Sequence, residues 1–234
     1  MVERGNLAVI PARGGSKRLP GKNTLAFRGR PMIAWTIEAA LESELFDRVI
    51  VSTDSPDIAR VAAECGLKVP FLRDGAADDM SPVSEATIRA LEQAESHFGE
   101  TYATVCQLMA NCPLRSAGEI VEAYANFERT GSEFQVSCFK FGWMNPWWAL
   151  RLDSGGRAER LFPEVMGKRS QDLDELYCPT GAIWLALTGA LKKAGTFYGP
   201  GVRYCPIDWK SAVDIDDSAD LEMAEAIAAS IGLK

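Results

Sequence analysis

The chain has 234 residues, of which 47% are hydrophobic and 24% are charged, and its formal net charge is −7. This balance is typical of a globular protein with a buried core, and it excludes a disordered or collagen-like chain. An acidic chain lacks the basic face of a general nucleic-acid-binding protein, so we expect no nucleic acid as a partner. No run approaches the ~18 consecutive apolar residues of a membrane-spanning helix, and the N-terminus has no apolar signal-peptide stretch. We therefore expect a cytoplasmic protein with no membrane partner.

Short apolar runs alternate with helical hydrophobic patterns over the first 141 residues. This alternation is typical of a parallel sheet whose strands are joined by right-handed crossover helices. The predicted strands cover residues 7–12, 48–53, 101–109 and 133–141, and the predicted helices cover residues 31–41, 54–66, 84–98 and 117–129. We predict one domain over residues 1–234, with a Rossmann-like three-layer α/β/α architecture around a mainly parallel sheet.

The residue composition changes at about residues 142–180, which contain three tryptophans, two adjacent glycines and a polar run from Lys168 to Asp172. We predict an inserted subdomain here, outside the alternation of strands and helices. Trp143, Trp147 and Trp148 fit either a subunit interface, where aromatic residues are enriched, or an ordinary core. The chain then returns to the sheet with a strand over residues 181–187 and ends in an amphipathic helix over residues 217–231.

The six cysteines include no CxxC pair and no cluster with the spacing of a zinc site. Several lie in apolar runs, where a free thiol behaves as a small hydrophobic side chain. We therefore predict reduced, buried thiols, not disulfides or metal ligands.

The loop after the first predicted strand is the strongest functional signal. From Gly5 to Ile37 there is no Asp or Glu, yet six cations fall there: Arg13, Lys17, Arg18, Lys22, Arg28 and Arg30. Such local charge in an acidic chain indicates a site for a polyanion. The loop follows the carboxyl end of a strand, where open α/β sheets bind ligands, and Gly14 and Gly15 let backbone N–H groups approach phosphate oxygens. The Walker and dinucleotide fingerprints are absent. The alternative is a tight turn with solvated charges.

A second constellation is the pair Asp214 and Asp216 near the C-terminus. Residues i and i+2 of an extended segment point to the same side, so the two carboxylates are predicted to lie together. Carboxylate oxygens suit a Mg²⁺ ion that also bridges phosphates. Alternatively, Asp216, Asp217 or Ser218 caps the final helix, and both roles can hold together.

Several ordered motifs resemble those of a known family. Residues 8–23, with the sequence AVIPARGGSKRLPGKN, resemble the signature of the acylneuraminate cytidylyltransferases, which are CMP-sugar synthetases for sialic acid and related nine-carbon acids. Residues 169–173, RSQDL, resemble the pseudaminic acid branch in particular. Further similar stretches cover residues 46–54, 70–73, 112–115, 213–216 and 220–221.

The resemblance implies a nucleotidyltransferase fold and a reaction in which the anomeric hydroxyl of a nonulosonic acid attacks the α-phosphate of CTP, with release of pyrophosphate. It implies Mg²⁺ as a cofactor, held by Asp214 and Asp216, with Arg13, Lys22 and Asp216 as catalytic residues. The implied nucleotide-binding residues are Ala12, Arg13, Gly14, Gly15, Ser16, Lys17, Lys22, Asn23 and Arg73. The inserted subdomain is expected to form a homodimer and to bring Lys168, Arg169 and Gln171 to the sugar in the partner's site.

Departures from the family pattern fall on the sugar side. Met109 stands where bacterial sialic acid enzymes have glutamine, Cys178 replaces an arginine and Thr180 replaces an asparagine. We place Met109 and Thr180 among the sugar-binding residues, and the sugar stays open among pseudaminic, legionaminic, N-acetylneuraminic and other acids. Two alternatives remain. One is a CMP-KDO-type synthetase, whose QGDEP-like turn is here residues 109–113, MANCP; the other is a catalytically silent nucleotide-binding subunit.

Overall fold

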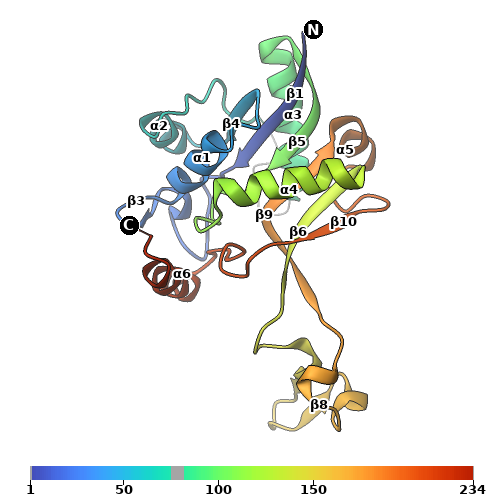
Figure 1. Cartoon of the computed structure of the whole chain (residues 1–234). Helices are drawn as coiled ribbons and strands as arrows, with labels where there is room; N and C mark the ends of the chain where they lie inside the picture. Colours follow the sequence, from blue (N-terminus) through green and yellow to red (C-terminus); the bar gives the residue numbers. More distant parts are fainter. Residues whose placement is uncertain (1, 75–81, 234) are drawn as a thin grey trace.

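The computed structural model describes residues 2–74 and 82–233, and its centre is a six-stranded sheet (Figure 1). In spatial order the strands are β10 (Arg203–Pro206), β6 (Phe134–Lys140), β9 (Tyr177–Leu187), β5 (Glu100–Gln107), β1 (Val2–Pro11) and β4 (Arg48–Ser52). β1 is parallel to both of its neighbours and β10 is parallel to β6, whereas β9 is antiparallel to β5 and to β6. The prediction of a mainly parallel sheet is confirmed.

Helices cover both faces of the sheet, because successive residues of a strand point to opposite sides. Ala8 and Ile10 pack on the side of α1 (Met32–Glu42), α2 (Pro56–Glu64) and α4 (Ala117–Thr130). Leu7 and Val9 pack on the side of α3 (Val83–Phe98) and α5 (Thr188–Ala194). α4 crosses in front of the sheet in Figure 1 and α3 lies behind it. These four side chains of β1 are fully buried, which confirms the three-layer α/β/α architecture.

A third group of apolar side chains joins the last helix, α6 (Ser218–Ser230), to the start of α1. Ile215 and Ala228 are fully buried with Phe27, which lies in a short hairpin of β2 (Ala26–Phe27) and β3 (Arg30–Pro31). The indole Nε1 of Trp35 donates a hydrogen bond of 3.1 Å to the Phe27 carbonyl. This packing holds the segment before α6 beside the loop that follows β1 (Figure 1).

Three of the elements that differ from the prediction are β9, α5 and β10. β9 begins at Tyr177, four residues before the predicted start, because its pairing with β6 resumes beyond a register shift and sets Phe139 opposite Cys178. α5 was not predicted because it has only seven residues and includes a glycine. β10 was missed because it is a four-residue strand that ends in a proline, a residue tolerated on the edge of a sheet.

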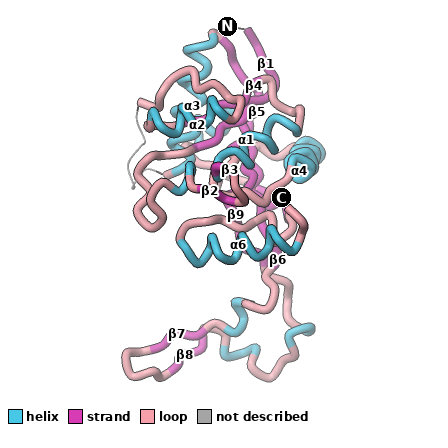
Figure 2. The backbone as a smooth tube through the Cα atoms, turned by 90° about the vertical axis from the view of Figure 1, so that its left-hand side faces the viewer, coloured by secondary structure: helices cyan, strands magenta, loops and turns pink. Residues whose placement is uncertain are grey.

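Residues 141–176, between β6 and β9, form a subdomain that projects from the sheet (Figure 2). It contains short 3-10 turns and a hairpin of β7 (Leu150–Leu152) and β8 (Ala158–Arg160). Within these residues, all of which the structure describes, Val165 is the one buried apolar side chain, and Trp143 is 88% exposed. Trp147 packs edge-on against Phe162 and donates a 2.9 Å hydrogen bond to the Asp174 carbonyl. Trp143 is therefore not a core residue of this chain.

The described helices, within residues 2–74 and 82–233, include none that is long and apolar enough to cross a membrane. All six cysteines are free thiols, and four of them are buried. Burial raises the pKa of Cys106 to about 12, so this thiol stays protonated at neutral pH.

Candidate active site

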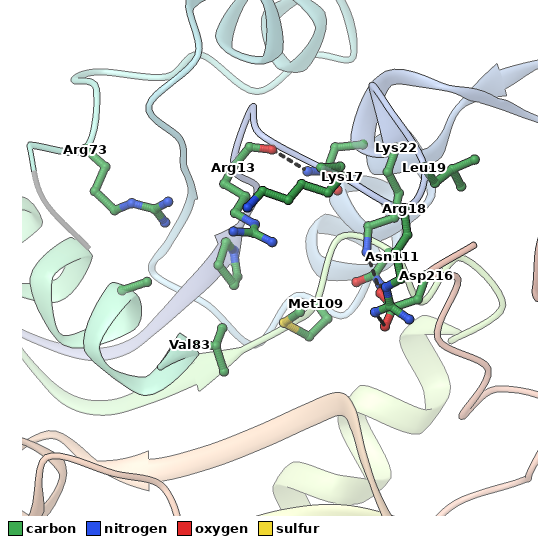
Figure 3. Close-up of a pocket in the computed structure, with 14 residues that line it drawn as sticks. Arg13, Lys17, Arg18, Leu19, Lys22, Arg73, Val83, Met109, Asn111 and Asp216 are labelled. Carbon is green, nitrogen blue, oxygen red and sulfur yellow. Dashed lines mark hydrogen bonds and ion pairs between the residues drawn. The ribbon is translucent and has the colours of Figure 1, made fainter. Parts of the chain in front are cut away.

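A pocket opens at the carboxyl ends of β1 and β5, between the loops that follow these strands and the first turn of α3 (Figure 3). Of the residues predicted from the sequence, it brings together Arg13, Ser16, Lys17, Lys22, Asn23, Arg73, Met109 and Asp216. It is completed by Pro11, Arg18, Leu19, Val83, Ala86 and Asn111. The local excess of cations in the sequence therefore becomes a positively charged wall.

The loop after β1 is fixed by contacts with its neighbours. The N–H of Gly14 donates to Oδ1 of Asp54 at 2.9 Å, and a Cβ at Gly14 would lie 3.1 Å from Cβ of Ser55. The loop thus packs closely on the start of α2, where only a glycine fits without displacement. The buried Asn23 donates from Nδ2 to the Arg13 carbonyl at 3.0 Å, which closes the loop on itself. These contacts leave the Arg13 and Lys17 side chains directed into the pocket (Figure 3).

Three other predicted residues of this loop have different surroundings. Ala12 is buried, and its N–H donates to the Ser52 carbonyl at 2.9 Å, as a continuation of the pairing of β1 with β4. The N–H of Gly14 is directed at Asp54, not at the pocket. A Cβ at Gly15 would meet nothing within 4 Å, so this glycine lies in open space.

Asp214 and Asp216 lie side by side, held by the loop after β5. Nδ2 of Asn111 donates to Oδ1 of Asp214, to Oδ1 of Asp216 at 3.4 Å and to the Ile215 carbonyl at 3.0 Å. The Ile215 N–H returns a 2.9 Å hydrogen bond to the Asn111 carbonyl. Asn111 is only 2% exposed, so the carboxylate pair is anchored to the interior.

The two carboxylates have opposite electrostatic surroundings. Burial on its own would raise the pKa of Asp216, but hydrogen bonds and charge attraction from Lys22 and Arg18 outweigh it and hold that pKa below its usual value. The Asp214 residue is exposed, yet its carboxyl group is crowded by protein atoms. This loss of solvation and the adjacent Asp216 carboxylate raise the pKa of Asp214 to about 6. A cation placed between the two groups would relieve their repulsion.

The N-terminus of α6 is capped by Asp217, not by Asp214 or Asp216. Asp217 is the N-cap of α6, and its Oδ1 accepts from the N–H groups of Ala219 at 2.9 Å and Asp220 at 3.1 Å. Asp220 completes a capping box through the Asp217 N–H. The side chains of Asp214 and Asp216 are therefore not needed as caps.

Arg73 closes the pocket at the end opposite Asp216 (Figure 3). It is 6% exposed, and its Nη1 donates to both the carbonyl and the Oγ of Ser52 at 3.4 Å. Burial lowers the pKa of its guanidinium. Val83 and Ala86 line the same pocket from the first turn of α3. This end combines apolar surface with one cation, which suits the base and ribose of a nucleotide.

Met109 lies on the floor of the pocket (Figure 3). A Cβ at Gly181 would lie 2.8 Å from Cγ of Met109, so the glycine in β9 leaves room for this side chain. The buried Arg115 donates from Nη1 to the Ala182 carbonyl at 2.7 Å and to the Met109 carbonyl at 3.4 Å. Thr180 is also buried, and its hydroxyl donates at 3.0 Å to the Ala212 carbonyl. Thr180 thus braces the segment that leads to Asp214 and does not line the pocket.

Lys168, Arg169 and Gln171 do not line the pocket of their own chain. They belong to residues 141–176, the subdomain that projects from the sheet (Figure 2). Arg169 forms an ion pair of 2.7 Å with Asp172, three residues further along. The structure of one chain therefore does not bring this group to the pocket.

Of the pocket residues that sequence reasoning missed, two are polar: Arg18 and Asn111. Arg18 belongs to the run of cations that indicated the site, so its charge was a usable signal. Asn111 lies in the turn over residues 109–113, but its contacts reach 103 to 105 residues along the chain, and no local pattern indicates them.

Known proteins with similar sequences identify the family of the chain. A family model described as cytidylyltransferase matches residues 7–141. The chain is 34% identical over 223 residues to the pseudaminic acid cytidylyltransferase of Campylobacter jejuni subsp. jejuni serotype O:23/36, with 95% of each chain covered. It is 36% identical to the CMP-N,N'-diacetyllegionaminic acid synthase of Legionella pneumophila subsp. pneumophila, with 94% of this chain and 95% of that one covered.

Comparison with solved structures shows which proteins share the fold of the chain. The chain is similar to a CMP:2-keto-3-deoxy-manno-octonic acid synthetase solved with CTP, with a TM-score of 0.72 at 18% identity over 97% of this chain and 100% of the other. At that identity the likeness concerns the fold alone. From the family model and the relatives, the chain belongs to the cytidylyltransferase family.

Proposed function

We propose that this protein activates a nonulosonic, sialic-acid-like sugar acid with CTP, forming the CMP-sugar and pyrophosphate. The observation that carries the proposal is the pocket itself, in which a cationic loop faces Asp216 at the carboxyl edge of the sheet, while Asp214 lies beside Asp216 on Asn111. The named activities of the relatives from Campylobacter and Legionella point to the same class of reaction.

The cationic loop would hold the triphosphate. Arg13 can fork across two phosphate oxygens, whereas Lys17 and Lys22 act as point charges. Arg73, with Val83 and Ala86, would receive the nucleoside at the other end of the pocket. In such transfers, positioning and charge neutralisation supply most of the catalysis.

Mg²⁺ fits the aspartate pair. The carboxylates of Asp214 and Asp216 lie on one side of the segment, and their mutual repulsion makes a divalent cation favourable there. Among the residues that the structure describes, no group of three acidic, histidine or cysteine side chains could hold a metal ion. Phosphate oxygens and water would complete its coordination. When bound, the ion would neutralise charge on the phosphates and make the sugar hydroxyl more nucleophilic.

The reaction balances without a covalent enzyme intermediate. A bond forms between the anomeric oxygen and the α-phosphorus, and the bond from that phosphorus to the oxygen bridging to the β-phosphate breaks. Pyrophosphate leaves and the hydroxyl proton passes to solvent or to a carboxylate. Arg13 and Lys22 would stabilise the charge that develops on the leaving group. Because the reaction consumes CTP, it would take place with the nucleotide pool in the cytoplasm.

The sugar would be bound across two chains. Lys168, Arg169 and Gln171 do not line the pocket of their own chain, and the projecting subdomain exposes apolar side chains that include Trp143 and Met144. A homodimer would cover these side chains and carry Lys168, Arg169 and Gln171 into the partner's pocket. Arg169 could then form a bidentate contact with the sugar carboxylate, while Met109 contributes an apolar surface on the pocket floor.

The test is pyrophosphate release from CTP and Mg²⁺ with a panel of acids: N-acetylneuraminic, pseudaminic, legionaminic and KDO. We expect release with one nine-carbon acid, and loss of that release in Asp216→Asn at unchanged melting temperature. Release with KDO alone would identify a CMP-KDO-type synthetase. Silence with tight CTP binding would indicate a catalytically silent subunit or an untested sugar, and absence of CTP binding would refute the proposal.

A further inference from the structure

Both oxygens of the Asp216 carboxylate are engaged by cations of the loop after β1 (Figure 3). Oδ2 accepts a hydrogen bond from Nη2 of Arg18, and Oδ1 accepts one from Nζ of Lys22 at 2.7 Å. The Lys22 side chain is largely buried, with 15% exposure, whereas that of Arg18 is 66% exposed. The same carboxylate that would bind the metal ion is thus the shared partner of two cations.

We propose that Arg18 is a further residue of the reaction, which pairs with Asp216 until a nucleotide draws its charge away and so couples metal binding to CTP binding. The inference rests on the proposed function, because it assigns a metal ion to Asp216 and a triphosphate to the pocket.

Electrostatics gives the reason for the coupling. A divalent ion that approaches Asp216 alone must displace a donor from an oxygen and come close to two positive charges. A triphosphate supplies oxygens that Arg18 and Lys22 can bind in place of the carboxylate. The nucleotide therefore converts both cations from competitors of the metal into ligands of the substrate. Arg18 is the freer of the two, because its side chain is solvent-exposed and ends in five donors that suit phosphate.

The coupling predicts that loss of the Arg18 charge strengthens metal binding without nucleotide and weakens binding of the metal–nucleotide complex. Without nucleotide, removal of the Arg18 charge favours the metal; with nucleotide, the same change removes a ligand of the phosphates. Coupling between two ligands is reciprocal, so both effects report on one interaction. A purely structural role for Arg18 would weaken both kinds of binding together.

The experiment compares Arg18→Gln with Arg60→Gln by Mn²⁺ titration, with the free ion measured by electron paramagnetic resonance. Arg60 is a matched control, since it is 62% exposed and pairs with Glu64 on α2 at 2.9 Å. Without nucleotide, we expect Arg18→Gln to bind Mn²⁺ about fivefold more tightly than the unsubstituted protein, which is the size expected for loss of an exposed ion pair. For the preformed Mn²⁺–CTP complex, which is not consumed without a sugar acid, we expect about fivefold weaker binding. Arg60→Gln should change neither.

A double variant, Arg18→Gln with Asp216→Asn, tests whether the change in Mn²⁺ affinity depends on the Asp216 carboxylate. In that background, Arg18→Gln should no longer tighten Mn²⁺ binding, because the carboxylate for which the cations compete is gone. The inference is overturned if Arg18→Gln leaves Mn²⁺ binding unchanged, weakens both kinds of binding, or tightens Mn²⁺ binding equally with and without Asp216. Failure of the proposed function looks different: the unsubstituted protein would not bind Mn²⁺–CTP, and the inference would fall with it.

Discussion

The pocket and the projecting subdomain are built in opposite ways. The pocket residues are positioned by buried partners, such as Asn23 and Asn111, which are 5% and 2% exposed. The residues expected to meet the sugar stand on an exposed turn, where Arg169 is 73% exposed and pairs with the nearby Asp172. Under the proposed function, the nucleotide end would be organised by its own chain, whereas the sugar end would depend on a second surface. Substitutions in the two regions should therefore affect different kinetic constants.

The largest expected effect is that of Lys22→Ala. Its charge pairs with Asp216 in the pocket, and the other buried cation of the lining, Arg73, lies at the opposite end. We expect kcat/KM for pyrophosphate release to fall by about 10³-fold or more, with little change in melting temperature. The matched control is Lys192→Ala, which breaks an ion pair with Glu95 outside the pocket and should keep its activity. Turnover by Lys22→Ala at the normal rate would remove Lys22 from the triphosphate site.

A smaller and more selective effect is expected in the subdomain. Arg169→Ala should raise the KM for the sugar acid by about 10- to 100-fold, as for loss of a hydrogen bond to a charged group, and leave the KM for CTP unchanged. Arg151→Ala is the control, because Arg151 lies on the same subdomain and is 70% exposed. Equal changes in the two KM values would contradict the division of labour between the regions.

The same contrast explains what could be predicted from the sequence. The cationic loop was recognisable because its charge excess and glycines are adjacent along the chain. The aspartate pair was recognisable because alternation in an extended segment is a local rule. The roles of Arg18 and Asn111 were not, because their partners lie 198 and about 104 residues away.

The fold could be predicted where local patterns determine it and could not where distant neighbours do. The strands and helices of the first 141 residues have strong periodic patterns, and the structure contains all of them. The antiparallel direction of β9 comes from its two neighbours, not from its own residues. The side chain of Thr180 could not be placed from the sequence either. Its position in the family pattern suggested a contact with the sugar, but the structure shows that its hydroxyl donates to the Ala212 carbonyl.

An effect on specificity is expected from Met109→Gln, at the point where the pocket approaches β9. Glutamine has a similar size, so it should fit against Gly181 while offering an amide in place of the thioether. We expect the ratio of kcat/KM between two nonulosonic acids to change by about tenfold, since one hydrogen bond or one apolar contact is worth that much. The KM for CTP should stay the same. Met223→Gln, on the exposed side of α6, is the control, and an unchanged ratio in Met109→Gln would show that Met109 does not select the sugar.

The smallest effect is expected at Asp217, the neighbour of Asp216. Asp217 caps α6 through two N–H groups, so Asp217→Ala should lower the free energy of unfolding by about 1 kcal/mol. For a domain of this size, that corresponds to a melting temperature about 2–4 °C lower. Activity and its dependence on Mg²⁺ should be preserved, because the side chain of Asp217 faces the helix and does not line the pocket.

Asp216→Asn should behave in the opposite way, with loss of Mg²⁺-dependent activity at nearly constant stability. Thermal unfolding and a Mg²⁺ titration of the reaction rate, both measured on the two variants, distinguish helix capping by Asp217 from metal binding by Asp216. If the activity of Asp217→Ala also lost its response to Mg²⁺, the capping box of α6 would be required for metal binding. In that case the position of Asp216 would depend on the helix cap as well as on Asn111.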